Sequence, residues 1–266
     1  MQLAVTGANG FLGSKIQEHL VSLGHEVVPF TRRNEMASVN WRMYSLQMPA
    51  SKIDLTDIEA VVHCAYDMTA VGANHLAVNG SGAAELAAAC RRSGTNLINI
   101  SSVIAARPKV SWYARAKHAS EVSVRGVHGT NIRLGLLTNF DDDLFANKVR
   151  RLIENRAIPF LPVPKGWVWQ SNLESLLTSV SESVNRPHER DIVWLGGQKP
   201  VSLKNHIMEI CSYVNSNKRL VEAPLISAKM LLWPFEKFSS SRTTFSIDAL
   251  CGMSGIMATV DPSEFV

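Results

Sequence analysis

Short apolar runs alternate with longer amphipathic segments along the first half of the chain. Five runs have the length and apolar composition of buried strands, namely residues 3–5, 25–30, 60–65, 96–100 and 131–134. The segments between them carry apolar residues at helical spacing. Apolar strands that alternate with helices are typical of a parallel sheet covered on both faces. The pattern therefore predicts an α/β fold with a doubly wound parallel sheet.

Three helices are predicted between these strands. The first begins near Leu12 and ends at Gly24, the second spans the alanine-rich residues 81–93, and the third spans residues 113–124. Pro29, in the second strand, has no backbone N–H to donate to a neighbouring strand. We therefore expect the end of that strand to be irregular.

The pattern changes after about residue 141. The sequence there predicts helices at residues 144–155, 203–214 and 223–238, a strand at 191–195, and a loop around Pro159, Pro162 and Pro164. No repeat or linker separates the two halves of the chain. We predict a sheet-forming domain at residues 1–140 and a reduced C-terminal lobe at residues 141–266, packed on the same sheet.

Composition and charge narrow the class of protein. The 266 residues carry a net charge of +4, which is too weak to predict a nucleic-acid partner. The cysteines Cys64, Cys90, Cys211 and Cys251 form no Cys-x-x-Cys pair, which argues against a disulfide framework or zinc site. The initial apolar run is too short for a signal peptide, and no run reaches the length of a membrane span. We expect a cytoplasmic protein with no membrane partner.

A glycine turn lies directly between the first strand and the first helix. Gly7, Gly10 and Gly13, with Phe11 and Leu12 between them, follow the pattern Gly-x-x-Gly-x-x-Gly. A dinucleotide pyrophosphate needs backbone amides at close range and a helix N-terminus behind them, which such a turn supplies. We predict a dinucleotide site here. The alternative is a strand–helix turn that binds no ligand.

The end of the second strand bears on the choice of dinucleotide. An acidic residue there would bind the ribose hydroxyls, but this chain has Thr31, Arg32 and Arg33. Guanidinium groups bind phosphate oxygens in bidentate fashion. The sequence therefore favours NADP over NAD, although NAD stays possible. The alternative is a solvated basic turn.

A serine, a tyrosine and a lysine have the spacing of a carbonyl-reducing site. Tyr113 and Lys117 are four residues apart and so share one face of the predicted helix. Ser101 and Ser102 end the fourth strand, at the edge where open α/β sheets bind ligands. A phenol can transfer a proton to a carbonyl oxygen, and a serine hydroxyl can hold that oxygen. A Tyr-x-x-x-Lys pair alone also occurs by chance on surface helices.

In these motifs the chain resembles the extended or atypical branch of the short-chain dehydrogenase/reductase superfamily, which includes the NAD-dependent epimerase/dehydratase family. The segments that carry the resemblance are residues 6–13, 61–65, 79–82, 100–102 and 113–117, with weaker similarity at 132–135, 167–173, 195–197 and 201–203. The resemblance implies a Rossmann-type sheet, with residues 1–140 as the dinucleotide-binding domain. It also makes a homodimer possible, through the helices at 81–93 and 113–124.

The resemblance also implies a role for each motif residue. Tyr113 would be the general acid/base, and Lys117 would hold the nicotinamide ribose and lower the pKa of Tyr113. Ser102 would bind the substrate oxygen, with Ser101 as the alternative. The remaining family positions correspond to Cys64, Ala65 and Tyr66, which would line the cofactor, and to Asn79, which would support the active site.

The implied activity is an oxidoreductase that exchanges hydride between NADP(H) and a secondary alcohol or ketone, with a sugar or nucleotide-sugar as the candidate substrate. Two alternatives stay open. One is a nucleotide-sugar epimerase or dehydratase with tightly bound NAD, and the other is a non-catalytic dinucleotide sensor or scaffold. The chain departs from the family in a shortened loop at residues 107–109, in the lack of acidic residues at 168–173, and in its short length. These departures leave the substrate open.

Four further positions invite a chemical interpretation. His63 lies inside an apolar strand, so we expect a packed strand residue. The three adjacent carboxylates at residues 141–143 point different ways, so we predict a solvated turn or a helix start and no metal site. Trp167 and Trp169 could stack on a sugar or base, or pack in the core.

Overall fold

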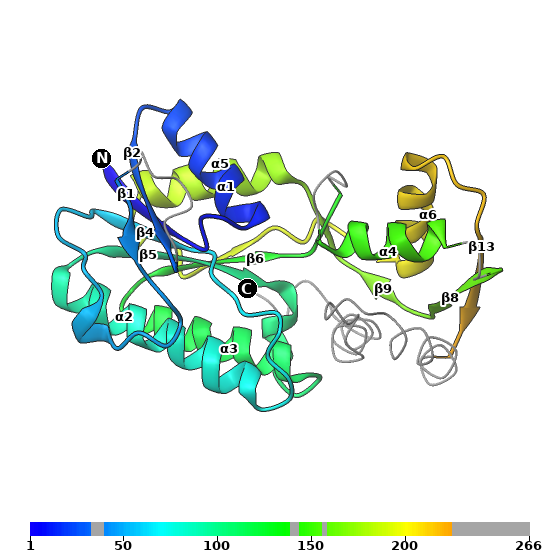
Figure 1. Cartoon of the computed structure of the whole chain (residues 1–266), viewed down its shortest axis with the longest axis horizontal. Coiled ribbons are helices and arrows are strands. Elements are labelled where there is room, and N and C mark those ends of the chain that lie inside the picture. The colour runs from blue at the N-terminus through cyan, green and yellow to red at the C-terminus, as the bar shows by residue number, and fades with distance from the viewer. Residues whose placement is uncertain (33–39, 139–143, 156–158, 225–266) are drawn as a thin grey trace.

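The computed structural model describes residues 1–32, 40–138, 144–155 and 159–224. A large parallel sheet with helices on both faces forms one end of the molecule, and a smaller lobe forms the other (Figure 1). This architecture confirms the predicted α/β fold. None of the helices within the described ranges has the length and apolar content that a membrane crossing requires.

The central sheet has seven strands in the order β11-β6-β5-β4-β1-β2-β3, and every neighbouring pair is parallel. The strands are β1 (Gln2–Thr6), β2 (Glu26–Thr31), β3 (Arg42–Met43), β4 (Ala60–His63), β5 (Asn96–Ser102), β6 (Thr130–Leu134) and β11 (Ile192–Trp194). The strand order reverses between β1 and β4. Ligands of open α/β sheets bind at such a reversal, outside the carboxyl ends of the strands.

Each face of the sheet is covered by a pair of helices. Helices α1 (Phe11–Ser22) and α5 (Leu173–Asn185) cover one face, and α2 (Ser81–Ser93) and α3 (Trp112–Arg125) cover the other (Figure 1). Successive strand residues point to opposite faces. Accordingly Leu3 and Val5 belong to the core under α1 and α5, whereas Ala4 belongs to the core under α2. The uniformly apolar strands follow from this double burial.

Short helices of the 3-10 and π types form the connections on the α2 side. They are the 3-10 helix η1 (Ala50–Lys52), the π-helix η2 (His75–Gly80), which leads directly into α2, and the 3-10 helix η3 (Val103–Ala106) after β5. Helix α2 ends at Gly94, whose φ of 71° is left-handed, as the predicted glycine stop requires.

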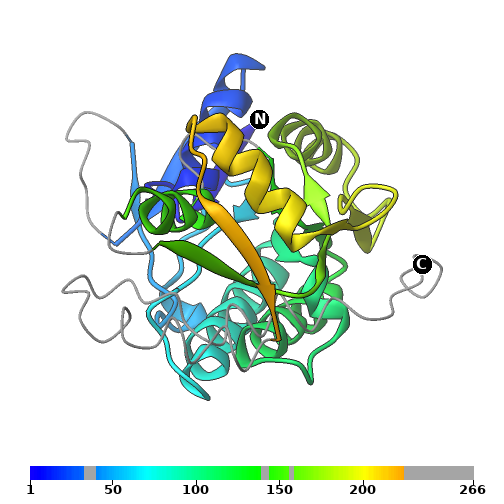
Figure 2. The same ribbon diagram turned by 90° about the vertical axis from the view of Figure 1, so that its right-hand side faces the viewer.

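The smaller lobe has its own apolar core, formed by α4, α6 and short strand pairs. Its elements are β7 (Leu136–Leu137), α4 (Leu144–Glu154), β8 (Phe160–Pro164), β9 (Trp167–Val168), β10 (Gln170–Ser171), β12 (Val201–Ser202), α6 (Leu203–Tyr213) and β13 (Arg219–Ala223). In Figure 2 the lobe faces the viewer, with α6 and β13 in front of the sheet. Between β10 and β12 the chain returns to the sheet as α5 and β11.

The structure corrects three predicted elements. Strand β2 is regular through Pro29. Strand β3 pairs with β2 only from Phe30 onward, so no hydrogen bond to β3 requires the amide that Pro29 lacks. The predicted proline loop contains strand β8, parallel to β13. Its Pro162 and Pro164 lie two residues apart, so both missing amides fall on one edge of the strand, and β13 needs only the other. Ala223 ends β13 and begins no helix, and most of 223–238 lies outside the described residues.

Candidate functional site

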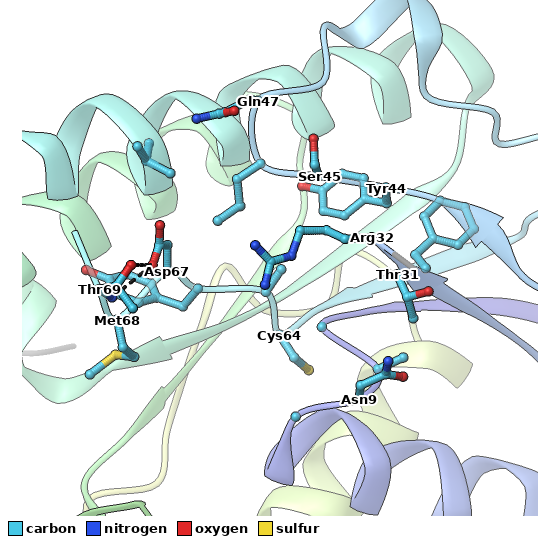
Figure 3. Close-up of a pocket in the computed structure, with 18 residues that line it drawn as sticks. Asn9, Thr31, Arg32, Tyr44, Ser45, Gln47, Cys64, Asp67, Met68 and Thr69 are labelled. Carbon is cyan, nitrogen blue, oxygen red and sulfur yellow. Dashed lines mark hydrogen bonds between the residues drawn. The ribbon is translucent and has the colours of Figure 1, made fainter. Parts of the chain in front are cut away.

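A pocket of about 780 Å³ opens where the strand order reverses (Figure 3). It is lined by the glycine turn after β1, by the end of β2, and by the residues that follow β3 and β4. Arg32, Asn9 and Asp67 reach it from three of these segments. The pocket therefore lies at the carboxyl ends of neighbouring strands, where the sequence places the predicted dinucleotide site.

The glycine turn is built so closely that side chains are excluded from it. Gly7 has a φ of +67°, and a Cβ on it would lie 2.8 Å from the amide nitrogen of Ala65. A Cβ on Gly13 would lie 2.2 Å from the carbonyl oxygen of Gly7. Helix α1 begins directly after Gly10, which has no side chain to cap the helix. The open amides at this helix start fit an anionic pyrophosphate.

The two apolar residues of the turn lie away from the pocket. Leu12 packs against the core between α1 and the sheet, and neither Phe11 nor Leu12 lines the pocket. The Leu12 side chain therefore anchors the start of α1 rather than forming the wall of the cavity.

Arg32 lies inside the pocket, opposite Asp67 (Figure 3). Hydrogen bonds from Thr69, with a smaller contribution from the Arg32 charge, hold the pKa of Asp67 below its usual range. Thr31 is buried at the pocket wall. The second arginine of the predicted pair, Arg33, lies outside the described residues. Sequence reasoning misses Asp67, since nothing in its neighbourhood marks it as facing a basic strand end.

The end of β4 is locked to β1 by a buried threonine. Thr6 Oγ1 lies 2.8 Å from His63 Nδ1 and accepts a hydrogen bond of 3.2 Å from the amide of Ala65. Burial lowers the pKa of His63 to about 3 and raises the pKa of the Cys64 thiol to about 12. Both side chains are therefore neutral at pH 7. His63 is a packed strand residue, as predicted.

The loop after β4 is held by Asn79. Its Oδ1 accepts from the amide of Asp67 at 2.6 Å, and its Nδ2 donates to the carbonyl oxygen of the same residue at 3.2 Å. Asn79 is almost fully buried in η2. It therefore acts on the pocket through the loop, by fixing Asp67 and its neighbours. Among the described residues, no group of His, Cys, Asp and Glu side chains is arranged to hold a metal ion.

Ser102, Tyr113 and Lys117 come together beside this pocket. Ser102 ends β5, while Tyr113 and Lys117 lie one turn apart in α3. The Ser102 hydroxyl lies within reach of the Tyr113 phenol and lowers the pKa of Tyr113. The Tyr113 ring contacts the ring of Tyr66, a pocket residue, with centroids 5.1 Å apart, and Lys117 Nζ lies 4.7 Å from the Tyr66 centroid. Tyr66 thus links the three residues to the dinucleotide pocket.

The electrostatics of this group differ from the expectation. Burial raises the pKa of Tyr113 to about 12, although the hydrogen bond to Ser102 counteracts it. Lys117 does not lower the pKa of Tyr113, because burial lowers the pKa of Lys117 to about 8, so Lys117 is charged at pH 7 but loses that charge before Tyr113 ionises. Its Nζ donates to the Ile100 carbonyl at 2.8 Å. Tyr113 is therefore a protonated phenol at neutral pH, the form that donates a proton.

The structure also decides between the two serines. Ser101 Oγ donates to Glu121 Oε1 at 2.6 Å, in a buried network that includes Arg133. Ser101 therefore points into the core, and Ser102 is the serine that contacts Tyr113. Of the two tryptophans, Trp169 is buried against Trp194, with centroids 5.2 Å apart, and Trp167 is exposed. Trp169 is thus a core residue.

Two buried histidines make stability depend on pH. Burial lowers the pKa of His63 to about 3 and that of His206, in the lobe, to about 4. Between these values and about 6.5, the unfolded chain binds protons that the folded chain does not, so stability falls as pH falls. We expect each histidine to reduce the free energy of unfolding by about 2 kcal/mol between pH 7.5 and pH 5, as urea denaturation would measure.

The variant His206→Gln separates this effect from general acid sensitivity. Between pH 7.5 and pH 5 the free energy of unfolding of this variant should fall less than that of the wild type, because the contribution of one of the two histidines is removed. The exposed His128, changed to Asn, serves as the control and should leave the drop unchanged. An unaltered pH dependence in His206→Gln would contradict the assignment.

Comparisons with known proteins agree with this architecture. Residues 1–104 match the family model described as the RmlD substrate binding domain. A stretch of 62 residues is 44% identical to an uncharacterized protein of Saccharomyces cerevisiae, and it covers 22% of this chain and 20% of that protein. The chain is therefore matched over about a fifth of that curated relative.

Solved structures are similar over most of the chain. The dTDP-4-dehydrorhamnose reductase of Bacillus anthracis, in complex with NADP, superposes with a TM-score of 0.69 at 18% identity over 85% of each chain. The UDP-N-acetylglucosamine 4-epimerase of Bacillus cereus gives 0.65 at 18% identity over 98% of each chain. A short-chain dehydrogenase/reductase superfamily protein of Agrobacterium tumefaciens with bound NAD gives 0.66 at 15% identity, over 84% of this chain and 85% of that one. The solved structures show that the chain shares their fold, and the family match over residues 1–104 agrees with the resemblance to the short-chain dehydrogenase/reductase superfamily.

Proposed function

We propose that this chain is an NADP(H)-dependent oxidoreductase that interconverts a secondary alcohol and a ketone. The observation that carries the proposal is the approach of Ser102 to Tyr113, whose ring contacts the pocket residue Tyr66, beside a pocket built on a glycine turn. A binding protein needs the pocket but has no use for a serine hydroxyl that acts on a phenol beside it. The pair therefore favours catalysis over a scaffold role.

The proposed chemistry assigns the proton steps to Tyr113. In the reducing direction its protonated phenol donates to the carbonyl oxygen of the substrate, while the Ser102 hydroxyl holds that oxygen by a hydrogen bond. The raised pKa of Tyr113 keeps the donor protonated at neutral pH. When bound, the nicotinamide ring supplies the hydride in this direction and accepts it in the reverse one.

Lys117 has two proposed tasks. Its ammonium group would hold the nicotinamide ribose hydroxyls, and its positive charge would favour the tyrosinate that forms after proton transfer. The charge lies close to the site, since Nζ lies over the ring of Tyr66, next to Tyr113. For the cofactor itself, the amides of the glycine turn would bind the pyrophosphate.

The preference for NADP(H) rests on Arg32, whose guanidinium lies in the pocket. Hydrogen bonds between charged groups contribute about 1.5–3 kcal/mol, or roughly tenfold to a hundredfold in affinity. We expect calorimetry of the purified protein to give a Kd for NADP(H) at least about tenfold below that for NAD(H). Equal or tighter binding of NAD(H) would overturn this assignment.

A substitution at Arg32 tests directly whether this residue causes the preference for NADP(H). Arg32→Ala should weaken NADP(H) binding by about tenfold or more and leave NAD(H) binding nearly unchanged, because only the former carries the additional phosphate. Arg186→Ala is the matched control. Arg186 is exposed at the end of α5, and its substitution removes the same charge as Arg32→Ala. Parallel losses for both dinucleotides would show that Arg32 acts on the shape of the pocket instead.

The proposed substrate is a sugar or nucleotide-sugar ketone. The supporting observation is that the similar structures named above include a dTDP-4-dehydrorhamnose reductase and a UDP-N-acetylglucosamine 4-epimerase. The epimerase or dehydratase alternative predicts NAD that stays bound through purification and no net oxidation of added NADPH. Analysis of the nucleotides released from heat-denatured protein distinguishes the two.

A further inference from the structure

A buried charged network lies beneath the Ser102–Tyr113–Lys117 site. Glu121 is fully buried in α3, and its carboxylate accepts hydrogen bonds from two other elements. Its Oε1 accepts from Ser101 Oγ at 2.6 Å and from Arg133 Nε at 2.9 Å. Its Oε2 accepts from an Arg133 terminal nitrogen at 2.7 Å. The network therefore joins helix α3 to strands β5 and β6 by side-chain bonds.

The position of the network relative to the site is set by the sequence spacing. Glu121 is four residues after Lys117 on the same helix, so it lies one turn further along the same face. Ser101 immediately precedes Ser102 on β5. The side chains of these neighbours point to opposite faces of the strand, so a bond that fixes Ser101 also fixes the direction of Ser102.

The stability of the fold gives little reason for this network. A buried ion pair loses the hydration of both charges, and apolar replacements of similar volume are often equally stable. Apart from Ser120, the other buried residues of α3 are apolar, namely Ala114, Ala116 and Val124. A buried carboxylate with three directed bonds contributes geometry that apolar packing does not.

We propose that Glu121 is a positioning residue of this site, which through Ser101 and Arg133 fixes the end of β5 against α3. The inference rests on the proposed function and extends it to a residue that touches neither substrate nor cofactor. Its effect is to keep the Ser102 hydroxyl and the Tyr113 phenol at bonding distance when α3 and β5 would otherwise shift against each other.

The network also affects the pKa of Lys117. The titratable groups around the Lys117 ammonium are His63 and Cys64 from β4 and its loop, Tyr66 from the same loop, and Tyr113 and Glu121 from α3. Burial lowers the pKa of Lys117, while Cys64 and then Glu121 raise it. The Cys64 thiol is protonated at pH 7 and so carries no charge that could act on Lys117. Glu121 is the carboxylate among these groups. It therefore helps Lys117 to keep its charge.

Ser101→Ala tests the tether, because it removes one bond and leaves the Glu121–Arg133 pair intact. With NADPH and phenanthrenequinone as the carbonyl probe, we expect kcat to fall by about tenfold and KM for NADPH to change by less than about twofold. The matched control is Ser120→Ala in α3, next to Glu121, where a buried hydroxyl donates to the Ala116 carbonyl at 3.0 Å. Equal kcat values for the two variants would overturn the proposal.

A second variant tests the charge without any turnover. Glu121→Gln combined with Arg133→Met removes both charges and keeps an oxygen that can accept from Ser101. The titration of Lys117, followed by carbon NMR of the signal that Lys117→Arg loses, should move to lower pH by about half a unit or more. An unchanged midpoint in a folded double variant would overturn this part of the proposal.

The two readouts separate this inference from the proposed function. A wild-type protein that fails to oxidise NADPH with any carbonyl would count against the oxidoreductase assignment. The shift in the Lys117 titration would still show that the Glu121–Arg133 pair acts on the site, since that measurement needs neither cofactor nor substrate.

Discussion

The variant Tyr113→Phe should lower kcat for carbonyl reduction by about a hundredfold to ten-thousandfold. Phenylalanine keeps the ring that packs on Tyr66 but removes the phenolic proton that α3 presents beside Ser102. Proton transfer to the developing alkoxide would then have to come from water. Because the ring is retained, we expect the Kd for NADP(H) to change by less than about threefold. Steady-state NADPH oxidation and calorimetry measure the two quantities separately.

The control for this prediction is the same substitution at Tyr213. That residue is half-exposed on α6, in the lobe, and its hydroxyl lies outside the pocket lining. Tyr213→Phe should leave kcat unchanged. A Tyr113→Phe protein with full activity, in the enzyme assay or in the cell, would eliminate the catalytic interpretation and favour the scaffold alternative.

Gly13→Ala should weaken dinucleotide binding by about a hundredfold or more. The added methyl group would lie 2.2 Å from the Gly7 carbonyl oxygen and 3.0 Å from the Cα of Ala8. Both neighbours are backbone atoms, so the turn itself has to move, and its amides leave the positions that fit a pyrophosphate. Calorimetry with NADP(H) checks this result, with circular dichroism to verify that the sheet and helices persist.

Gly94→Ala controls for the general cost of placing a methyl group on a glycine. Gly94 ends α2 with a φ of +71° and no atom near the added carbon, so the variant should lose about 1–2 kcal/mol of stability. It should bind NADP(H) normally, because Gly94 precedes β5 at the opposite edge of the sheet from the pocket. Comparable binding losses in both variants would mean that Gly13→Ala acts through stability alone.

Most of the sheet is predictable because its signals are local. Strands β1, β4, β5 and β6 are apolar runs bounded by glycine or polar residues, and helix α2 ends at a glycine. The lobe is less predictable. Strand β8 contains two prolines, which indicate a loop unless the partner β13 and its single paired edge are known. Such pairing joins residues about sixty positions apart, and no local pattern records it.

The candidate site shows the same division. The spacing of Tyr113 and Lys117 is a helix property, and the four-residue interval alone puts both side chains on one face. The choice between Ser101 and Ser102 depends on what each hydroxyl meets across the sheet. Glu121 carries no signal in the sequence, because a carboxylate inside an amphipathic helix normally faces solvent, and Arg133 from β6 is what makes its burial possible.

By itself the sequence determined the alternation of strands and helices, the glycine turn and the residue types for proton transfer. These follow from covalent spacing, since periodicity and glycine geometry act over a few residues. The tertiary structure decided which serine lies beside Tyr113, that Arg32 faces the pocket, and that the pKa of Tyr113 is raised above its usual value. Those outcomes depend on burial and on partners from distant segments, because desolvation and charge act through space and not along the chain.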